Sequence, residues 1–275
     1  MQVRTNGRVV SIPLDEYVLG STLAEVSPVN QSADVTEIIF EVQAILTRTY
    51  AVAKIGRHSA DGFDLCDTTH CQVYDPNRIR TSRFATVARE AVERTSGRIL
   101  TYGQRPVEAV YHADCGGHTA AAESVWGGRV PYLVSEPDNL SIDPHRKWRV
   151  SVTAEKLRSA LNANAATAVG RKLDDVRVAT RDASGRATSV SVTGEHARTL
   201  RGEQLRSVVN AALGDRTIQS TKLTITRTNA TYVFEGAGFG HGVGLCQVGA
   251  AARAKRGDAV DEILAHYFPG ARVSK

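Results

Sequence analysis

The sequence predicts an α+β fold, with mixed and antiparallel sheets, packed helices and a central groove. Three observations support this class. Residues 37–54 carry the apolar stripe of a helix, several short segments alternate apolar and polar residues, and residues 148–233 order strands and helices as an inserted α/β lobe would. At 275 residues the chain can bury a substantial core, so we expect a single domain over residues 1–275 that contains this lobe.

Composition and charge are those of an ordinary soluble globular protein. Hydrophobic residues make up 42% of the chain, and no apolar run approaches the roughly 18 residues of a membrane-spanning helix. The excess of 34 Lys and Arg over 29 Asp and Glu is mild and scattered, which favours a solvated surface. No stripe of basic and aromatic residues predicts a nucleic-acid partner. The first residues lack the apolar core of a secretory signal, so we expect either a cytoplasmic chain or one without its leader.

The first residues predict a β-hairpin followed by a short helix. Residues 2–13 alternate apolar and polar side chains around Asn6 and Gly7, a pair that favours a tight turn. Residues 14–26 then predict a helix that ends before Pro28.

This helix contains the first candidate catalytic residue. Glu25 lies between the apolar residues Leu23 and Val26. A half-buried carboxyl group at such a position would have a raised pKa, which is the property that a general acid needs. By itself, however, a lone glutamate is more often a surface residue.

The clearest helix covers residues 37–54. Its apolar stripe steps by four and three residues and consists of Ile38, Val42, Ile45, Thr49 and Val52. Gly56 is expected to end the helix. Arg48 and Tyr50 lie beside the centre of the stripe, so their side chains either reach into a site or lie on the surface.

The loop-like segment that follows gathers thiols and imidazoles. Within fourteen residues it contains His58, Cys66, His70 and Cys71, a set that suits tetrahedral zinc. The spacing is not that of a standard zinc finger, and the adjacent His70 and Cys71 would point apart in a strand. Metal binding is the favoured interpretation, while a Cys66–Cys71 disulfide and two unbound thiols stay open.

A second amphipathic helix, a hairpin and a polar turn come next. Residues 83–96 predict the helix, ended by Gly97, and residues 99–119 predict the hairpin. The turn contains Tyr111, His112, Cys115, Gly116, Gly117 and His118. It either faces a ligand or is a plain tight turn. Beyond it, Trp126 and Tyr132 either stack on sugar rings or fill the core.

The segment 148–233 predicts the inserted lobe. We expect strands at 148–153, 174–182, 187–194, 222–228 and 231–236, and helices at 154–164 and 202–213. Ser184 and Gly185 predict a hairpin turn between two of these strands. Because the segment is poor in histidine, cysteine and paired acids, we interpret it as scaffold.

Glycine recurs at every second position from Gly236 to Gly244. In an extended chain these glycines would line one bare face, which would allow the close approach of a ligand or of another backbone. The alternative is a sharply curved strand with a core histidine. Two short helices, at residues 247–256 and 258–268, are expected to follow.

Five segments in this order resemble the motifs of one family. They are LDEYVLGSTLAEVSP, EVQAILTRTYAVAK, CDTTHCQVYD, YHADCGGHT and GFGHGVGLCQVGAAARA. In these motifs, and over roughly Val9 to Val273, the chain resembles the family of stage II sporulation protein D and the amidase enhancer of cell-wall lytic enzymes. Each motif alone is modest, but their order is specific.

The resemblance implies an extracytoplasmic lytic transglycosylase that cuts peptidoglycan glycan strands, with Glu25 as the family's catalytic acid. Hydrolases normally need two carboxylates, whereas one glutamate is enough for a lytic transglycosylase. It protonates the leaving oxygen and then takes a proton from the C6 hydroxyl of muramic acid. That hydroxyl attacks C1 and gives a 1,6-anhydro end. No second acid lies in a comparably distinctive motif, which favours this route.

The same matching implies the substrate contacts. Arg48 and Tyr50 belong to the helix behind the acid. One wall of the groove would be formed by Tyr111, His112, Gly116 and Gly117, and the other by His241 and Gln247. Between them, the bare glycine face would let a sugar ring approach the backbone.

Cofactor and cysteine roles also follow from the resemblance. It implies structural zinc and no organic cofactor, with His58, Cys66, His70 and Cys71 as the ligands. Cys115 and Cys246 occupy positions in the two groove walls where sporulation members tend to carry serine, and we expect a disulfide between them. Since the family acts outside the cytoplasm, a leader or anchor is expected to be absent from this chain.

Two other functions stay open. One is a non-catalytic glycan-binding module that stimulates a cell-wall amidase, as the enhancer branch of the family suggests. The other is a zinc-dependent amidase that acts on the wall peptide through an open coordination position. Two thiolates in the ligand set make a structural zinc more plausible than a catalytic one.

Overall fold

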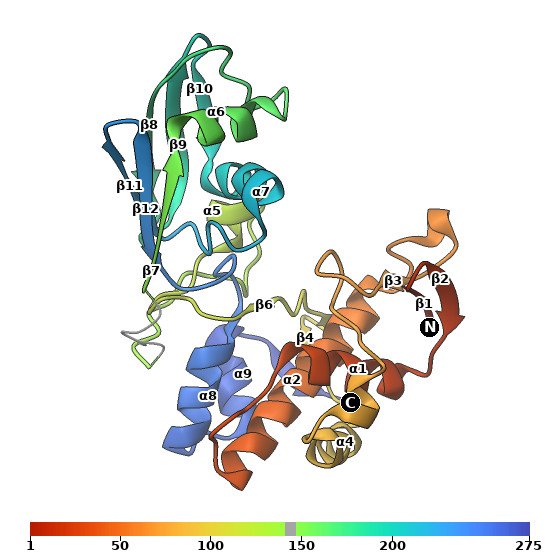
Figure 1. The fold of residues 1–275 in the computed structure, drawn as a ribbon. Helices are drawn as coiled ribbons and strands as arrows, with labels where there is room; N and C mark the ends of the chain where they lie inside the picture. The colour runs from red at the N-terminus through yellow and green to blue at the C-terminus, as the bar shows by residue number, and fades with distance from the viewer. Residues whose placement is uncertain (141–146) are drawn as a thin grey trace. The chain divides into compact units, whose positions relative to one another are not determined.

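The computed structural model describes residues 1–140 and 147–275, and it confirms the α+β class. The chain forms two compact units (Figure 1). The first unit comprises residues 1–110 and 250–275, and the second comprises residues 111–249. The predicted lobe of residues 148–233 lies within the second unit. In the described ranges, no helix has the length and apolarity needed to cross a membrane.

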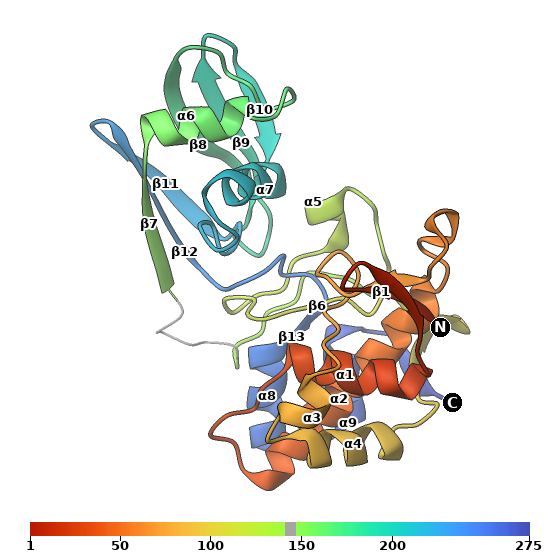
Figure 2. The same cartoon turned by 45° about the vertical axis from the view of Figure 1, so that its right-hand side comes forward.

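The first unit is mainly helical (Figure 2). Its helices are α1 (Leu14–Glu25), α2 (Ala33–Lys54), α3 (Arg78–Thr81), α4 (Ala85–Arg94) and α9 (Val260–Tyr267), with α8 (Gln247–Arg256) joining it from Ala250 onward. Its strands are β1 (Gln2–Thr5), β2 (Arg8–Ser11), β3 (Leu65–Cys66), β4 (Ile99–Tyr102), β5 (Arg105–Pro106) and β14 (Arg272–Ser274). The helices α1, α2 and α4 share one hydrophobic core.

The predicted helices and the first hairpin of this unit are confirmed, with shifts at their ends, whereas the hairpin expected over residues 99–119 is confined to β4 and β5. The hairpin of β1 and β2 turns at Asn6 and Gly7, whose φ angles of 49° and 76° are those that a tight hairpin turn requires. The helix expected to begin at residue 37 begins at Ala33, because Ser32 supplies the extended residue that precedes it. Gly56, with φ of 76°, follows its end.

The second unit is built from two three-stranded antiparallel sheets and two helices around one core. One sheet has the order β10 (Arg198–Arg201), β9 (Ala187–Gly194), β8 (Leu173–Arg181). The other has the order β11 (Leu223–Thr228), β12 (Thr231–Ala237), β7 (Lys147–Thr153). The main helices are α6 (Ala154–Asn162) and α7 (Gly202–Leu213), and shorter elements are β6 (Tyr111–His112), α5 (Ala122–Trp126) and β13 (Leu245–Cys246). Strand β10 was not predicted.

The prediction of an extended glycine strand is wrong. Strand β12 ends at Ala237, and Gly238, Gly240, Gly242 and Gly244 all have positive φ angles. Their faces are also not bare, since a Cβ atom on Gly240 would lie 2.8 Å from Cβ of His112. One on Gly242 would lie 2.3 Å from Nε of Arg186. These glycines therefore let the chain coil tightly against other parts of the protein.

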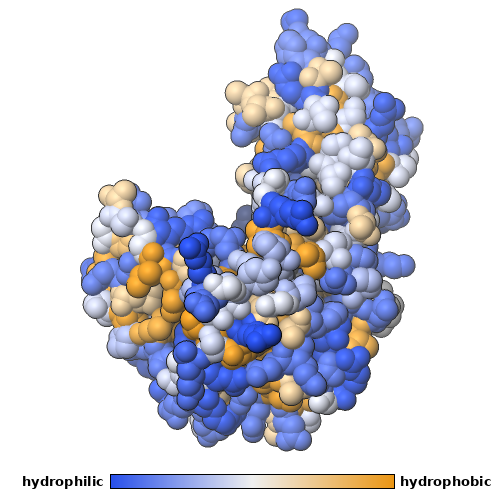
Figure 3. All heavy atoms as spheres, turned by 180° about the vertical axis from the view of Figure 1, so that it is seen from behind, coloured by the Kyte–Doolittle hydropathy of each residue, from blue (hydrophilic) through white to orange (hydrophobic). Residues whose placement is uncertain are grey.

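The surface matches the composition. On the face shown in Figure 3, hydrophilic side chains predominate and hydrophobic ones form small separate patches. The large hydrophobic side chains that are exposed in the described residues are Val9, Val10, Val29, Ile55, Tyr102 and Trp126. They come from different elements, and single exposed apolar residues are normal for a protein surface.

Candidate functional site

The candidate acid ends helix α1. Glu25 is the last residue of this helix and is partly buried. Its Oε1 atom accepts a hydrogen bond of 3.1 Å from the backbone N–H of Val73. Val73 follows Cys71 by two residues, so the loop that carries the thiols and imidazoles also contacts the acid. We call residues 58–74 the Cys-His loop.

The carboxyl end of the Cys-His loop packs against α1. The rings of Tyr17 and Tyr74 stack with centroids 5.3 Å apart, and the Tyr17 hydroxyl donates to Oε1 of Gln72 at 3.4 Å. Gly20 makes this contact feasible, because a Cβ atom at its position would lie 2.4 Å from Cε2 of Tyr74. The residues on either side of Val73 are therefore held on the helix that ends in Glu25.

The four predicted metal ligands converge in the first unit. Each offers a ligand atom within 4.8 Å of the others: His58, Cys66, His70 and Cys71. Sγ of Cys71 lies 3.4 Å from Nε2 of His58 and 3.7 Å from Nδ1 of His70. The expected conflict between His70 and Cys71 does not arise, because the chain turns here, with the Cys71 N–H bonded to the Thr68 carbonyl oxygen.

The surroundings of the cluster act in opposite directions on its two thiols. Burial alone would raise the pKa of Cys66, but hydrogen bonds from Thr68 and His70 lower it to about 7. Burial raises the pKa of Cys71 to about 11. Nδ1 of His58 lies 3.6 Å from the carboxylate of Asp61, an arrangement that orients a ligating imidazole. The residues present therefore fit zinc, with two sulfur and two nitrogen donors.

Arg48 and Tyr50 are buried in the first unit. The Arg48 guanidinium forms an ion pair of 3.0 Å with Asp15 and donates to the backbone oxygens of Val92 and Thr95. Arg48 thus connects helices, and these contacts indicate a structural role for its side chain. The Tyr50 hydroxyl accepts a hydrogen bond of 2.8 Å from Arg57, and the other terminal nitrogen of Arg57 lies 3.4 Å from Nε2 of His70.

In the second unit, strand pairing brings the predicted wall residues together. Strands β6 and β13 run parallel, with Tyr111 opposite Leu245 and His112 opposite Cys246. Helix α8 begins at Gln247, directly after β13. The turn of Gly116 and Gly117, whose φ angles are 68° and 91°, follows β6 and is closed by a hydrogen bond of 2.8 Å from the Gly116 N–H to Asp114.

Two aromatic rings flank His241 in this unit. Its ring centroid lies 5.5 Å from that of His112 and 5.2 Å from that of Trp126, which is 44% exposed. Its Nδ1 atom accepts a hydrogen bond from the Val243 N–H at 3.0 Å. Burial, with the charges of Arg186 and Arg206, lowers the pKa of His241 to about 4, so the ring is neutral at pH 7.

The disulfide expected between Cys115 and Cys246 is not formed in the structure, which holds all four cysteines as thiols. The two side chains are nevertheless neighbours, because the Cys115 N–H donates to Sγ of Cys246 at 3.2 Å. The Cys66–Cys71 disulfide, one of the open alternatives, is also not formed.

One site residue was missed by sequence reasoning. Arg186 lies in the segment interpreted as scaffold, yet it is 1% exposed and donates to the backbone oxygen of Cys115 at 3.0 Å. Burial lowers its pKa. Its Nε and Nη1 atoms are buried without a hydrogen-bond partner among the described residues. A single arginine after a Ser-Gly turn resembles a surface residue, so the sequence carried no signal for this role.

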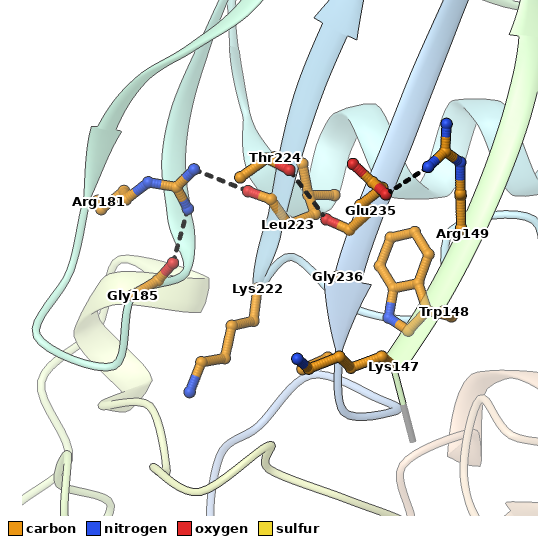
Figure 4. Close-up of a pocket in the computed structure, with 11 residues that line it drawn as sticks. Lys147, Trp148, Arg149, Arg181, Gly185, Lys222, Leu223, Thr224, Glu235 and Gly236 are labelled. Carbon is orange, nitrogen blue, oxygen red and sulfur yellow. Dashed lines mark hydrogen bonds and ion pairs between the residues drawn. The ribbon is translucent and has the colours of Figure 1, made fainter. Parts of the chain in front are cut away.

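The second unit also contains a hollow of about 510 Å³ beside β7, β11 and β12 (Figure 4). Four cationic side chains line it: Lys147, Arg149, Arg181 and Lys222. Arg181 donates to the backbone oxygens of Gly185 and Leu223. The Lys222 ammonium donates to the Gly116 oxygen at 2.7 Å. Arg181 and Lys222 therefore hold the scaffold strands and the turn of Gly116 and Gly117 in place.

Comparisons with known proteins give a consistent family assignment. The model of a family described as stage II sporulation protein matches residues 4–102, and that of a domain of unknown function matches residues 138–244. Stage II sporulation protein D of Bacillus subtilis is 29% identical over 98% of this chain and 77% of its own length. An uncharacterized protein of Brachyspira hyodysenteriae is 30% identical over 96% of this chain and 67% of its own length.

A relative with a different name points to the same family. The amidase enhancer of Bacillus subtilis is 26% identical over 85% of this chain, which spans 37% of the enhancer's length. The first family model covers α1, α2 and the Cys-His loop, and thus both Glu25 and the four clustered ligands. The chain belongs to the stage II sporulation protein D family.

Proposed function

We propose that this chain is an extracytoplasmic lytic transglycosylase that cleaves peptidoglycan glycan strands at N-acetylmuramic acid. The observation that carries the proposal is the placement of Glu25. It is a partly buried carboxyl group at the end of a helix, and the Val73 amide fixes its Oε1 atom. A catalytic acid needs such a defined position more than it needs a second acid nearby.

Glu25 would act twice in this reaction. As an acid it gives its proton to the glycosidic oxygen, and the bond between that oxygen and C1 of muramic acid breaks. As a carboxylate it then takes the proton from the C6 hydroxyl of the same sugar, whose oxygen attacks C1. The products are a 1,6-anhydro-muramic end and a new hydroxyl on the leaving sugar, and Glu25 recovers its proton.

The Cys-His loop supports the role of Glu25 as the acid because it holds Glu25 in position. A bound zinc ion would cross-link His58, Cys66, His70 and Cys71, and thereby stabilise the loop. The loop in turn supplies the Val73 N–H to Glu25 and packs Tyr74 on α1. Four protein ligands leave no open coordination position, which favours a structural zinc over a wall-peptide amidase.

Glycan contacts are proposed for the second unit. Trp126 is exposed and lies beside His241, and aromatic rings commonly stack on sugar faces. Tyr111 and Gln247 are partly buried at the paired ends of β6 and β13. We retain these residues as candidate contacts, together with the turn of Gly116 and Gly117, and assign Arg48 a structural role.

A non-catalytic amidase enhancer is the second candidate function. It is favoured by the similarity to the protein named amidase enhancer, which extends over 85% of this chain. In that case the chain would bind glycan and stimulate a separate cell-wall amidase. Glu25 would then be dispensable for both binding and stimulation.

The decisive experiment is mass spectrometry of purified glycan strands, with and without stem peptides, after incubation with the protein. Wild type is expected to produce anhydro-muramic ends, and Glu25→Gln to lower their rate of formation by about 10²–10⁴-fold. Glu16→Gln is the matched control, because Glu16 is an exposed acid in the same helix.

Each other product has a defined meaning. Reducing ends instead of anhydro ends would mean hydrolysis, and free stem peptide would mean amidase activity. If no strand is cut and Glu25→Gln still stimulates an added cell-wall amidase, the enhancer function replaces the transglycosylase.

A further inference from the structure

A second group of soft metal ligands lies in the second unit. His112, Cys115 and Cys246 each offer a ligand atom within 4.8 Å of the other two, and all three side chains are buried. None of them belongs to the Cys-His loop. The parallel pairing of β6 with β13 creates this group, because it sets His112 directly opposite Cys246.

His112 has the tautomer that a metal ligand needs. Its Nδ1 atom lies 3.1 Å from the Val243 carbonyl oxygen, which can only accept, so Nδ1 carries the proton. Nε2 therefore presents a lone pair. This atom is buried and has no hydrogen-bond partner among the described residues. Because His112 is only 5% exposed, solvent does not replace that partner. A backbone carbonyl on the other ring nitrogen is the usual support of a ligating histidine.

Backbone amides prepare Cys246 for the thiolate form. Its sulfur accepts the N–H groups of Cys115 at 3.2 Å and of Gly249 at 3.4 Å. It directly precedes helix α8, so it also lies at the positive end of the helix dipole. The Cys115 sulfur lies 3.7 Å from Oδ2 of Asp138, which is fully buried.

We propose that His112, Cys115 and Cys246 bind a thiophilic d10 metal ion, Zn²⁺ or Cu⁺. Two thiolates and one imidazole are the donors that such ions prefer. Binding would release the two thiol protons to solvent. A disulfide between the two cysteines would leave the Nε2 lone pair of His112 without a partner, whereas a metal ion satisfies all three side chains. With Zn²⁺ the two thiolate charges are balanced, so no net charge is added beside the buried Arg186.

The test is the metal content of the 275-residue chain, measured by elemental mass spectrometry after dialysis against Zn²⁺ or, without oxygen, Cu⁺. Wild type is expected to hold one equivalent in each cluster. Cys115→Ser with Cys246→Ser is expected to lose one equivalent, and His112→Gln to weaken the same one. Cys66→Ser with Cys71→Ser should keep one equivalent and, with Co²⁺, a sulfur-to-metal charge-transfer band.

Three results would overturn the proposal. The first is a single equivalent in wild type that disappears completely in Cys66→Ser with Cys71→Ser. The second is unchanged metal content in His112→Gln and in Cys115→Ser with Cys246→Ser. The third is a Cys115–Cys246 disulfide in non-reducing peptide maps of the folded wild type. The wild-type stoichiometry and the peptide map decide the question even where a serine variant does not fold.

Discussion

Arg48 shows how a charged side chain can hold helices together from inside a core. Its side chain is 2% exposed, while its partner Asp15 is 54% exposed. The guanidinium reaches the carboxylate of α1 and the backbone oxygens of Val92 and Thr95 at the end of α4. Those carbonyl oxygens lie at the end of a helix, where no N–H group of the helix is left to bond them. Arg48 therefore connects three helices.

Replacing Arg48 should destabilise the protein without a direct effect on chemistry. Arg48→Ala removes the guanidinium that bonds Asp15 and the oxygens of Val92 and Thr95, and it opens a cavity, so we expect the free energy of unfolding to fall by about 2–4 kcal/mol. Urea denaturation measures the change. Arg149→Ala is the control, because its ion pair with Glu235 is exposed and is expected to contribute about 0–1 kcal/mol. Equal stability of Arg48→Ala and wild type would contradict the structural role.

At the scale of elements, Gly20 decides how closely the Cys-His loop approaches α1. The Tyr74 ring occupies the space that a side chain at position 20 would fill. The same contact places Val73 where its N–H reaches Glu25. One glycine thus connects a helix face to the position of the candidate acid.

Gly20→Ala is expected to lower stability by about 1–3 kcal/mol and to slow glycan cleavage, because the methyl group forces Tyr74 away from α1. Denaturation and product formation should be measured together. Gly128→Ala is the control, since a Cβ atom there meets nothing within 4 Å and its φ is not positive. If Tyr74→Ala fails to relieve the effect of Gly20→Ala in the double variant, the steric explanation is wrong.

The sequence predicted those elements whose signals are local. The hairpin at Asn6 and Gly7, the apolar stripe of α2 and the strands and helices of the lobe, apart from β10, follow from short-range patterns. The coiled path from Gly238 to Gly244 does not, because a period of two glycines fits both an extended strand and a chain of positive φ angles. Only the packing against His112 and Arg186 decides between them.

The candidate site was predictable only in part, for a similar reason. Motifs identified Glu25 and the four residues of the Cys-His loop, but spacing did not show that His70 and Cys71 share a turn. The burial of Arg48 and the contact of Arg186 with Cys115 depend on tertiary packing. Such side chains look like surface residues until the fold is known.

At the scale of the whole molecule, each unit has its own hydrophobic core. The core of the first unit joins α1, α2 and α4, and that of the second joins the two sheets with α6 and α7. The two clusters of thiols and imidazoles are likewise divided, one to each unit. A change in one cluster should therefore act mainly on its own unit.

Loss of the two thiol ligands in the Cys-His loop should disturb the position of Glu25, although Glu25 itself is unchanged. In Cys66→Ser with Cys71→Ser, zinc would no longer cross-link the Cys-His loop, so the hydrogen bond from Val73 to Glu25 should open more often. We expect faster hydrogen exchange in residues 58–74 and slower glycan cleavage, with exchange in β7 to β12 unchanged. Cys115→Ser with Cys246→Ser is the matched control, because it should leave exchange in residues 58–74 as in wild type. Full cleavage activity in Cys66→Ser with Cys71→Ser would show that the loop does not position Glu25, since Glu25 itself is intact in that variant.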